Sequence, residues 1–306
     1  MFYFIVNEHG GSGQAVGVWN RVQKILDERG VKYQKFVPET KGYAAVLAEQ
    51  ISEKEDDDIR LIVVGGDGTI NEVLNGIRSF ERLKFMVIPT GSGNDFSRGL
   101  GLPLKNTEKV VDMILNSTGI KTIDLGMVES GGRRRIFGIS SGLGLNALVG
   151  TEINRSKIKN IMNKLHLNSL SYAVMTVKTL FTMKTSTFKV SFDGGALQEF
   201  DRAIFLAAMN FPCEGGGVPM APNANANDGK LSFTLAARIP KWKCFIAFPF
   251  LLAARQDLIK GFFMKDARTV DVFTSEPNVS HTDGELFGKV NKIHYECLAR
   301  KLKILL

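Results

Sequence analysis

The chain has few of the residues that form covalent or metal cross-links. Its 306 residues include three cysteines and four histidines. The cysteines, Cys213, Cys244 and Cys297, form no C-x-x-C pair, and the histidines have no metal-ligand spacing. A disulfide framework and a zinc site are therefore disfavoured, and a reducing compartment is expected.

Long hydrophobic runs are also missing. The longest apolar run, Cys244 to Ala254, has 11 residues, whereas a helix needs about 20 to span a bilayer. The first apolar segment, Phe2 to Val6, is too short for the hydrophobic part of a signal peptide and has no basic residue before it. We therefore expect a cytoplasmic protein.

Acidic residues are scarce in the second half of the chain. Residues 1–124 contain 15 Lys or Arg and 17 Asp or Glu, a net charge of −2, whereas residues 125–306 contain 24 and 14, a net charge of +10. No acidic residue lies between Glu152 and Asp193. This asymmetry indicates a polyanionic partner, with solvated basic surfaces as the simpler alternative. An anionic membrane is favoured over nucleic acid, because no stacking motif or reading helix is evident.

The first 124 residues alternate between short apolar runs and segments with apolar residues at helical spacing. Apolar runs at 2–6, 33–37, 61–64 and 85–88 predict strands, and the segments 18–26, 43–51 and 70–77 between them predict helices. The acidic run 53–58 is interpreted as a solvated loop. Alternation of this kind predicts an α/β domain with a doubly wound parallel sheet.

The remainder of the chain has a different pattern. Strands are predicted at 202–209, 230–236, 268–273, 277–282, 292–297 and 301–305, and helical stretches at about 153–184 and 241–263. We therefore expect a second, mainly antiparallel β-rich domain over residues 125–306, after a first domain over residues 1–124. Whether the last residues pack back onto the first domain is left open.

Three glycine-rich loops follow predicted strands, at residues 7–13, 65–69 and 89–95. In a doubly wound sheet, ligands bind beyond the carboxyl ends of the strands, where backbone N–H groups and helix N-termini favour phosphate. No P-loop sequence occurs. Residues 142–147 fit a G-x-G-x-x-A pattern, but no acidic residue follows about 20 residues later to hold a ribose.

Asp67 and Asp95 lie in two of these loops, each after a predicted buried strand. Two carboxylates beside phosphates repel them unless a divalent cation lies between, which is the arrangement typical of Mg²⁺. The alternative is that both residues only cap the helices that follow. Because the arrangement occurs twice, the Mg²⁺ interpretation is favoured.

The chain carries a longer ordered series of motifs that includes these loops. They are Val6-Asn7 with the glycines after it, Gly65-Gly66-Asp67-Gly68-Thr69 with Asn71-Glu72, Pro89 through Asn94-Asp95-Phe96, Asp124-Leu125-Gly126, Asn210, Gly215-Gly216-Gly217, Pro222, Asp228-Gly229 and Asp283-Gly284-Glu285. The series resembles the diacylglycerol kinase catalytic domain family of lipid kinases, which also includes sphingosine and ceramide kinases. The G-G-D-G-T loop alone is shared with NAD kinases and phosphofructokinases.

The resemblance implies transfer of the γ-phosphoryl group of ATP to a lipid hydroxyl, in a cleft between an ATP-binding α/β domain and a β-sandwich. Catalytic Mg²⁺ would be held through water by Asp67, Asp95 and Asp124, and a structural Mg²⁺ by Asp228 with the carbonyls of Asn225 and Lys230. The residues implied to hold ATP are Asn7, Glu8, His9, Gly10, Gly11, Thr40, Gly66, Asp67, Gly68, Thr69, Ile70, Asn71, Glu72, Ser92 and Asn94.

Two carboxylates are candidates for the catalytic base. Asp283 and Glu285 flank Gly284 just after a predicted strand, and alternation along a strand would put both side chains on one face. A carboxylate there can accept the proton of the attacking hydroxyl. Glu285 is favoured, with Asp283 as the alternative and Asp67 as a further catalytic carboxylate.

Residues 239–265 carry Trp242 and five phenylalanines between basic ends. They predict either an amphipathic helix that faces a membrane or aromatic side chains in the sandwich core.

Three functions stay open: a lipid kinase at an anionic membrane surface, an NAD or other small-molecule kinase, and a non-catalytic nucleotide-binding regulator. The acid-free basic stretch and the Asp283-Gly284-Glu285 segment favour the first. The sequence does not identify which lipid is phosphorylated. It does not determine the oligomeric state either, and a homodimer is one of the states left open.

Overall fold

A parallel sheet forms the centre of the first domain. The computed structural model describes residues 1–9, 13–149 and 178–305. Strands β1 (Phe2–Val6), β2 (Tyr33–Phe36), β3 (Ile59–Gly65) and β4 (Leu83–Pro89) lie in the order β4-β3-β1-β2. β1, β3 and β4 are almost entirely buried, as expected of parallel strands covered on both faces. The predicted doubly wound α/β fold is confirmed.

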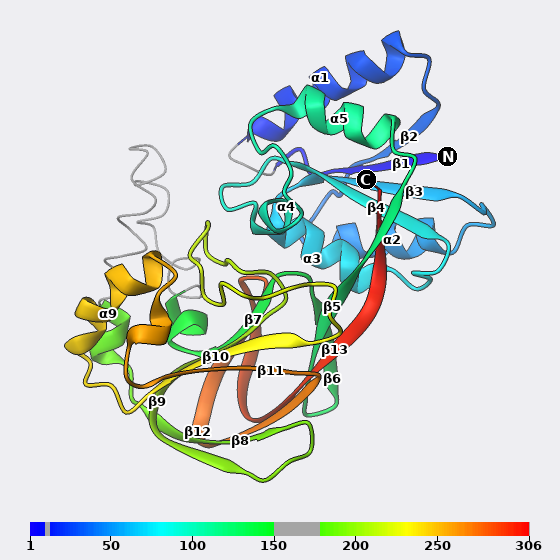
Figure 1. Ribbon diagram of the computed structural model, residues 1–306. Helices are drawn as coiled ribbons and strands as arrows, with labels where there is room; N and C mark the ends of the chain where they lie inside the picture. Colours follow the sequence, from blue (N-terminus) through cyan, green and yellow to red (C-terminus); the bar gives the residue numbers. More distant parts are fainter. Residues whose placement is uncertain (10–12, 150–177, 306) are drawn as a thin grey trace.

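Helices cover both faces of this sheet (Figure 1). α1 (Gln14–Glu28) lies beside α5 (Thr107–Leu115) on one face, and α2 (Tyr43–Ser52) lies beside α3 (Asp67–Gly76) on the other. The short helix α4 (Asp95–Gly99) follows β4. A Cβ atom on Gly76 would lie 2.0 Å from the carbonyl oxygen of Ala45, so α2 and α3 approach each other at a point where only glycine fits.

The second domain consists mainly of antiparallel strands, as predicted. Its strands are β5 (Ile120–Ser130), β6 (Arg133–Phe137), β7 (Ser140–Gly144), β8 (Ser186–Phe192), β9 (Gln198–Met209), β10 (Leu231–Ala237), β11 (Phe262–Ala267), β12 (Thr269–Thr282) and β13 (Glu285–Leu305). Their pairings within the domain are antiparallel. Phe188, Leu206 and Tyr295 lie in their common core.

Two pairs of predicted strands are each one continuous strand. Residues 268–273 and 277–282 fall in β12 except for position 268, and residues 292–297 and 301–305 both fall in β13. The pairing register shifts between Phe273 and Asn278 and between Leu298 and Leu302. Such irregularities bend a strand and interrupt its alternation without ending it, which explains why the sequence pattern shows breaks there.

The predicted helix over 241–263 is shorter in the structure. α9 (Lys243–Leu252) ends before Ala254, which has a φ of 57°, and is followed by the 3₁₀ turn η2 (Gln256–Leu258) and by β11. Of the other predicted helical stretch, residues 178–182 are helical and residues 153–177 lie outside the described part of the chain. Among the described residues, no helix combines the length and apolar character that crossing a bilayer requires.

The last strand connects the two domains. β13 pairs with β5 from His294 to Leu305, and near its end it also pairs in parallel with β4, with Lys303 opposite Lys84 and Ile304 opposite Phe85. Figure 1 shows the carboxyl terminus beside the strands of the first domain. The two domains thus share one hydrogen-bonded sheet.

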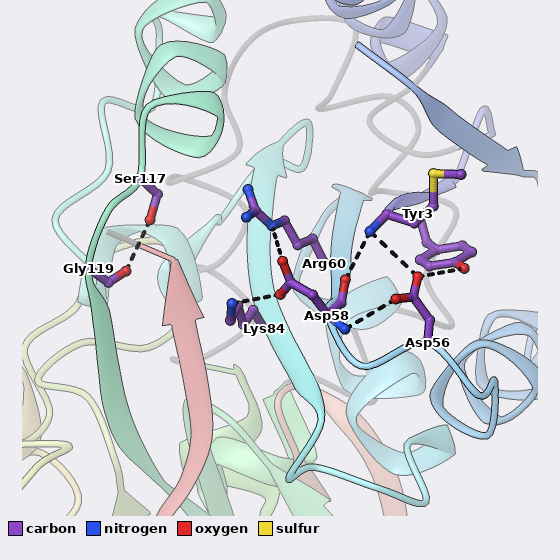
Figure 2. Close-up of polar contacts among 8 residues, drawn as sticks. Tyr3, Asp56, Asp58, Arg60, Lys84, Ser117 and Gly119 are labelled. Atoms are coloured by element: carbon purple, nitrogen blue, oxygen red, sulfur yellow. Dashed lines mark hydrogen bonds and ion pairs between the residues drawn. The ribbon is translucent and has the colours of Figure 1, made fainter.

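Hydrogen bonds and ion pairs link neighbouring strands of the first sheet at the edge where the strands begin (Figure 2). The Tyr3 hydroxyl donates to Asp56 at 3.2 Å, and Asp58 pairs with Arg60 at 3.0 Å and with Lys84 at 2.6 Å. The acidic run before β3 is therefore not only a solvated loop, because two of its carboxylates fix this edge. The glycine-rich loops lie at the opposite, carboxyl edge.

Candidate active site

The loops after β1, β3 and β4 lie side by side, because these strands are parallel neighbours. The side-chain amide of Asn7 donates to the Thr69 hydroxyl at 2.8 Å and so links the first loop to the second. A Cβ atom on Gly66 would lie 3.0 Å from Cα of Gly91, which shows how closely the second and third loops approach. Backbone N–H groups at the starts of α3 and α4 are thereby gathered at one edge, an arrangement suited to phosphate.

Asp67 and Asp95 stand in the first turns of α3 and α4. The Asp67 carboxylate accepts hydrogen bonds from the backbone N–H groups of Asp95 (3.1 Å) and Phe96 (3.2 Å), so it caps α4. Asp95 accepts one from the backbone N–H of Gly216 in the second domain, at 2.7 Å. A Cβ atom on Gly93 would lie 3.1 Å from Oδ2 of Asp67 and 3.5 Å from Oδ2 of Asp95. One oxygen of each carboxylate therefore borders the same small space.

This arrangement is electrostatically costly without a cation. Burial and the neighbouring charge of Asp95 raise the pKa of Asp67 to about 6. Two close carboxylates fit Mg²⁺, which binds through one or two carboxylates and takes its other ligands from water and phosphate oxygens. Within the described ranges, no three His, Cys, Asp or Glu side chains converge on a metal position. Asp67 and Asp95 could thus supply part of a Mg²⁺ coordination shell.

Asp124, the third carboxylate of the predicted set, has different neighbours. It is fully buried, and its carboxylate accepts hydrogen bonds from the backbone N–H groups of Gly229 and Arg300, both at 2.7 Å. Its own backbone N–H donates to the carbonyl of Ala226 at 2.7 Å. These contacts give Asp124 the role of holding the segment 225–230.

That segment contains the second predicted Mg²⁺ site. Asn225, Asp228 and Lys230 are exposed, and the Asp228 carboxylate accepts a hydrogen bond from the backbone N–H of Lys230 at 3.0 Å. The Asn225 side-chain oxygen accepts one from the backbone N–H of Asn227 at 3.2 Å. The segment presents oxygen atoms, the donor type that Mg²⁺ prefers, and its metal binding stays a prediction.

A tight turn separates Asp283 from Glu285. Asp283 and Gly284 have φ values of 48° and 80° and form the tight turn between β12 and β13, so strand alternation does not extend across them. The Asp283 carboxylate accepts hydrogen bonds from the backbone N–H groups of residues 138–140 (2.8 to 3.0 Å) and from the Asn71 side chain (2.8 Å). Burial raises the pKa of Asp283, and these donors oppose that shift. Asp283 therefore anchors the turn, and strand alternation, on which the expectation of a shared face rested, does not relate it to Glu285.

Glu285 lies at the boundary between the domains. Its side chain is 25% exposed, and a Cβ atom on Gly68 would lie 3.3 Å from its Oε1. The Lys41 ammonium is 2.7 Å from its Oε2. Within the turn, the backbone N–H of Gly284 donates to Nδ1 of His281, whose pKa is lowered by burial. A carboxylate of the second domain thus reaches the G-G-D-G-T loop of the first.

Several predicted ATP ligands are on the open side of the loops. His9, Thr40 and Ser92 are exposed, and Asn7, Gly66, Gly68 and Glu72 are partly exposed. Gly10 and Gly11 lie outside the described residues.

Other predicted ATP ligands are engaged within the protein. Glu8 pairs with Lys35 at 2.6 Å, and the side-chain amide of Asn94 bonds both backbone polar groups of Gly91. The predicted ligands that are buried are Thr69, Ile70 and Asn71. The Asn71 side chain donates to Asp283 and accepts from Arg135, which commits it to the contact between domains.

Two cations of the site were not predicted from the sequence. Lys41 follows the predicted ligand Thr40 and reaches Glu285. The Arg98 guanidinium lies 3.3 Å from the Asp95 carboxylate and donates to the carbonyl of Gly93. The sequence could have indicated the contact of Arg98 with Asp95, because Arg98 follows it by one helical turn. No feature of the local sequence indicates that Lys41 pairs with Glu285.

Comparison with known proteins identifies the family. The model described as "Diacylglycerol kinase catalytic domain" matches residues 1–128, and that described as "YegS C-terminal NAD kinase beta sandwich-like domain" matches residues 140–306. The chain is 29% identical over 296 residues to YtlR of Bacillus subtilis (strain 168), with 94% of each chain covered. It is 29% identical over 277 residues to the diacylglycerol kinase of Staphylococcus carnosus (strain TM300), with 88% of this chain and 85% of the relative covered.

Solved structures show the same fold. A diacylglycerol kinase structure from Bacillus anthracis str. Sterne matches with a TM-score of 0.70 and 21% identity, covering 99% of this chain and 96% of that one. A second structure from that strain matches over the same shares with a TM-score of 0.77 and 24% identity. The catalytic-domain model covers residues 1–128, and the sandwich-domain model covers more than half of the chain. The chain therefore belongs to the diacylglycerol kinase family of lipid kinases.

Proposed function

We propose that this lipid kinase transfers the γ-phosphoryl group of ATP, with Mg²⁺, to the hydroxyl of diacylglycerol or a related lipid at an anionic membrane surface. The observation that carries the proposal is the position of Glu285 beside Gly68, which puts a carboxylate of the β-rich domain against the G-G-D-G-T loop. Phosphoryl transfer depends mainly on alignment of the reactants and on charge neutralisation. Both requirements can be met where the two domains meet.

The first domain is proposed to hold the nucleotide. The glycine-rich loops supply backbone N–H groups for the phosphates, and the Arg98 guanidinium adds a positive charge beside Asp95. Asp67 and Asp95 would hold Mg²⁺, which when bound neutralises phosphate charge. Without the cation these two carboxylates would repel the phosphates.

The second domain is proposed to present the acceptor hydroxyl. Glu285 accepts its proton as the oxygen attacks the γ-phosphorus, with the ADP oxygen as the leaving group. Asp283 fixes the turn that carries Glu285, and Lys41 orients the Glu285 carboxylate. Neither residue needs to accept a proton in this role.

The relatives support a diacylglycerol-type acceptor, since several are named diacylglycerol kinases. The +10 charge of residues 125–306 supports work at an anionic surface. A second candidate is an NAD or other small-molecule kinase, because the matching sandwich model is described as NAD kinase-like.

Labelled ATP tests the proposal. The protein is incubated with [γ-³²P]ATP, Mg²⁺ and, separately, diacylglycerol, a sphingoid base, phosphatidylglycerol or NAD. We expect Mg²⁺-dependent label in diacylglycerol or a close relative and loss of that label in Asp67→Ala. Asp201→Ala, which changes an exposed aspartate on β9, is the matched control and should label normally. Label in NAD alone, or in no acceptor, would contradict the proposal.

A further inference from the structure

The outer sides of α9 are almost wholly apolar. Its inner stripe is Cys244, Ala247 and Leu251: Ala247 is buried, and the other two pack, partly buried, against a hydrophobic cluster that includes residues of β9 and β10. Among the side chains that the structure describes on the helix and its first flanking residue, five large apolar ones stay 39% to 59% exposed: Trp242, Ile246, Phe248, Phe250 and Leu252. A surface helix normally has polar residues opposite its buried stripe. The turn η2 contacts α9, and its residue Leu258 is 57% exposed. We call the five exposed residues and Leu258 together the α9 face.

The segment that carries the α9 face is rich in basic residues. Residues 239–265 contain five cations against one acid, Asp257, and the cations are Lys241, Lys243, Arg255, Lys260 and Lys265. Asp257 is paired with Arg255 at 3.2 Å, so it does not offset the other four. Lys243 lies over the Trp242 ring at 5.4 Å from the ring centroid, and Lys260 is exposed. The face therefore combines aromatic side chains with positive charge.

We propose that the α9 face docks onto an anionic bilayer, with its apolar side chains in the boundary between headgroups and acyl chains and with Lys243 and Lys260 at the headgroups. Interfacial helices of this kind carry Trp, Phe and Leu on one side and Lys or Arg beside them. The charge of the region is complementary to anionic lipid. This inference deepens the proposed function, on which it rests, by naming the surface that approaches the membrane. A second copy of the chain is the competing occupant.

The chain contains its own probe for this contact. Of its two tryptophans, Trp242 is 57% exposed on the α9 face, whereas Trp19 is 1% exposed in the core of the first domain. Transfer of an indole from water into the interface shifts its emission to shorter wavelength. Vesicles of phosphatidylcholine with about 30 mol% of the anionic lipid phosphatidylglycerol should therefore shift the emission, and brominated acyl chains should quench it. Trp242→Leu should remove both signals.

Variants then test the face itself. Ile246→Gln with Phe250→Gln should weaken vesicle binding by at least about tenfold, because two apolar side chains no longer leave water. Lys243→Gln with Lys260→Gln should weaken it by up to about fivefold for each lysine, and added salt should remove most of that difference. The matched control is Ile120→Gln with Leu197→Gln, which changes two apolar residues of similar exposure, 51% and 57%, elsewhere on the surface. This control should bind as wild type does.

The outcomes separate docking from catalysis. Activity on detergent-dispersed diacylglycerol should be unchanged in the α9 variants, because none of their residues lies in the candidate active site. Wild-type vesicle binding by both α9 variants would overturn the docking face without affecting the kinase proposal. A wild-type dimer by light scattering that becomes monomeric in Ile246→Gln with Phe250→Gln would assign the face to a second copy and overturn it too. Trp242-dependent binding without phosphorylation of any lipid would support the docking face and contradict the proposed function.

Discussion

The Lys41 ammonium of the first domain lies 2.7 Å from the Glu285 carboxylate of the second, although 244 positions separate the two residues in the chain. Lys41 is 77% exposed, so the pair is open to solvent on one side. Exposed ion pairs contribute at most about 1 kcal/mol. The contact therefore adds little to the stability of the protein, and its main effect is to hold the Glu285 carboxylate in one orientation.

Lys41→Met is expected to lower kcat by up to about fivefold, the factor that corresponds to an exposed ion pair. Lys41→Arg should restore most of the rate, because it keeps the charge. Steady-state kinetics at saturating ATP, with melting temperature as a check on folding, measure the effect. A loss of more than about a hundredfold would show that Lys41 acts directly on the reacting groups.

Asp283→Asn is expected to destabilise the protein by roughly 2 to 4 kcal/mol, because an amide replaces a buried carboxylate that accepts four N–H hydrogen bonds. Urea unfolding measures the change. Asp201→Asn, on an exposed aspartate, is the control and should stay within about 0.5 kcal/mol of wild type. Unchanged stability in Asp283→Asn would remove the anchoring role given to this residue.

Asp67 should make stability depend on pH when Mg²⁺ and nucleotide are absent. Its pKa is raised to about 6, so the folded protein keeps a proton that the unfolded chain releases near pH 4. Wild type should therefore lose stability, relative to Asp67→Asn, as the pH rises from about 4 through 6. Thermal melts of both proteins in EDTA give the difference. Parallel curves for the two proteins would show that Asp67 ionises normally.

Two glycines in helices should respond in opposite ways to alanine. Gly76→Ala is expected to cost at least about 2 kcal/mol, because its Cβ would lie 2.0 Å from the Ala45 carbonyl oxygen. Gly17→Ala, inside α1 with no atom within 4 Å of its Cβ, should stabilise by about 0.5 to 1 kcal/mol. Denaturant unfolding compares them, and equal effects would contradict the described contact of α2 with α3.

The sequence predicted those parts of the fold that depend on local pattern. β1, β3 and β4 are continuous apolar runs followed by glycines, and parallel pairing then places their loops at one edge. Strand breaks in β12 and β13 were predicted where the register shifts, since a bulge and a loop interrupt alternation alike.

Within the candidate site, contacts between distant residues escaped prediction. Alternation suggested one face for Asp283 and Glu285, whereas Asp-Gly is itself the sequence signal for a tight hairpin turn that redirects the first side chain. Asp124 was grouped with Asp67 by resemblance, but its carboxylate binds the backbone of Gly229 and Arg300. Pairings over such sequence distances follow from the packing of the two domains.

The most direct test of the account is the rate of γ-phosphoryl transfer by Glu285→Gln, measured with saturating ATP and Mg²⁺ on the lipid that wild type phosphorylates fastest. Removal of a general base typically costs ~10² to 10⁴ in turnover and leaves nucleotide affinity nearly intact. We expect a loss of that size with the ATP dissociation constant, measured by calorimetry, within about twofold of wild type. Turnover within a few-fold of wild type would contradict the assignment of Glu285 as the proton acceptor and with it the proposed geometry of the active site.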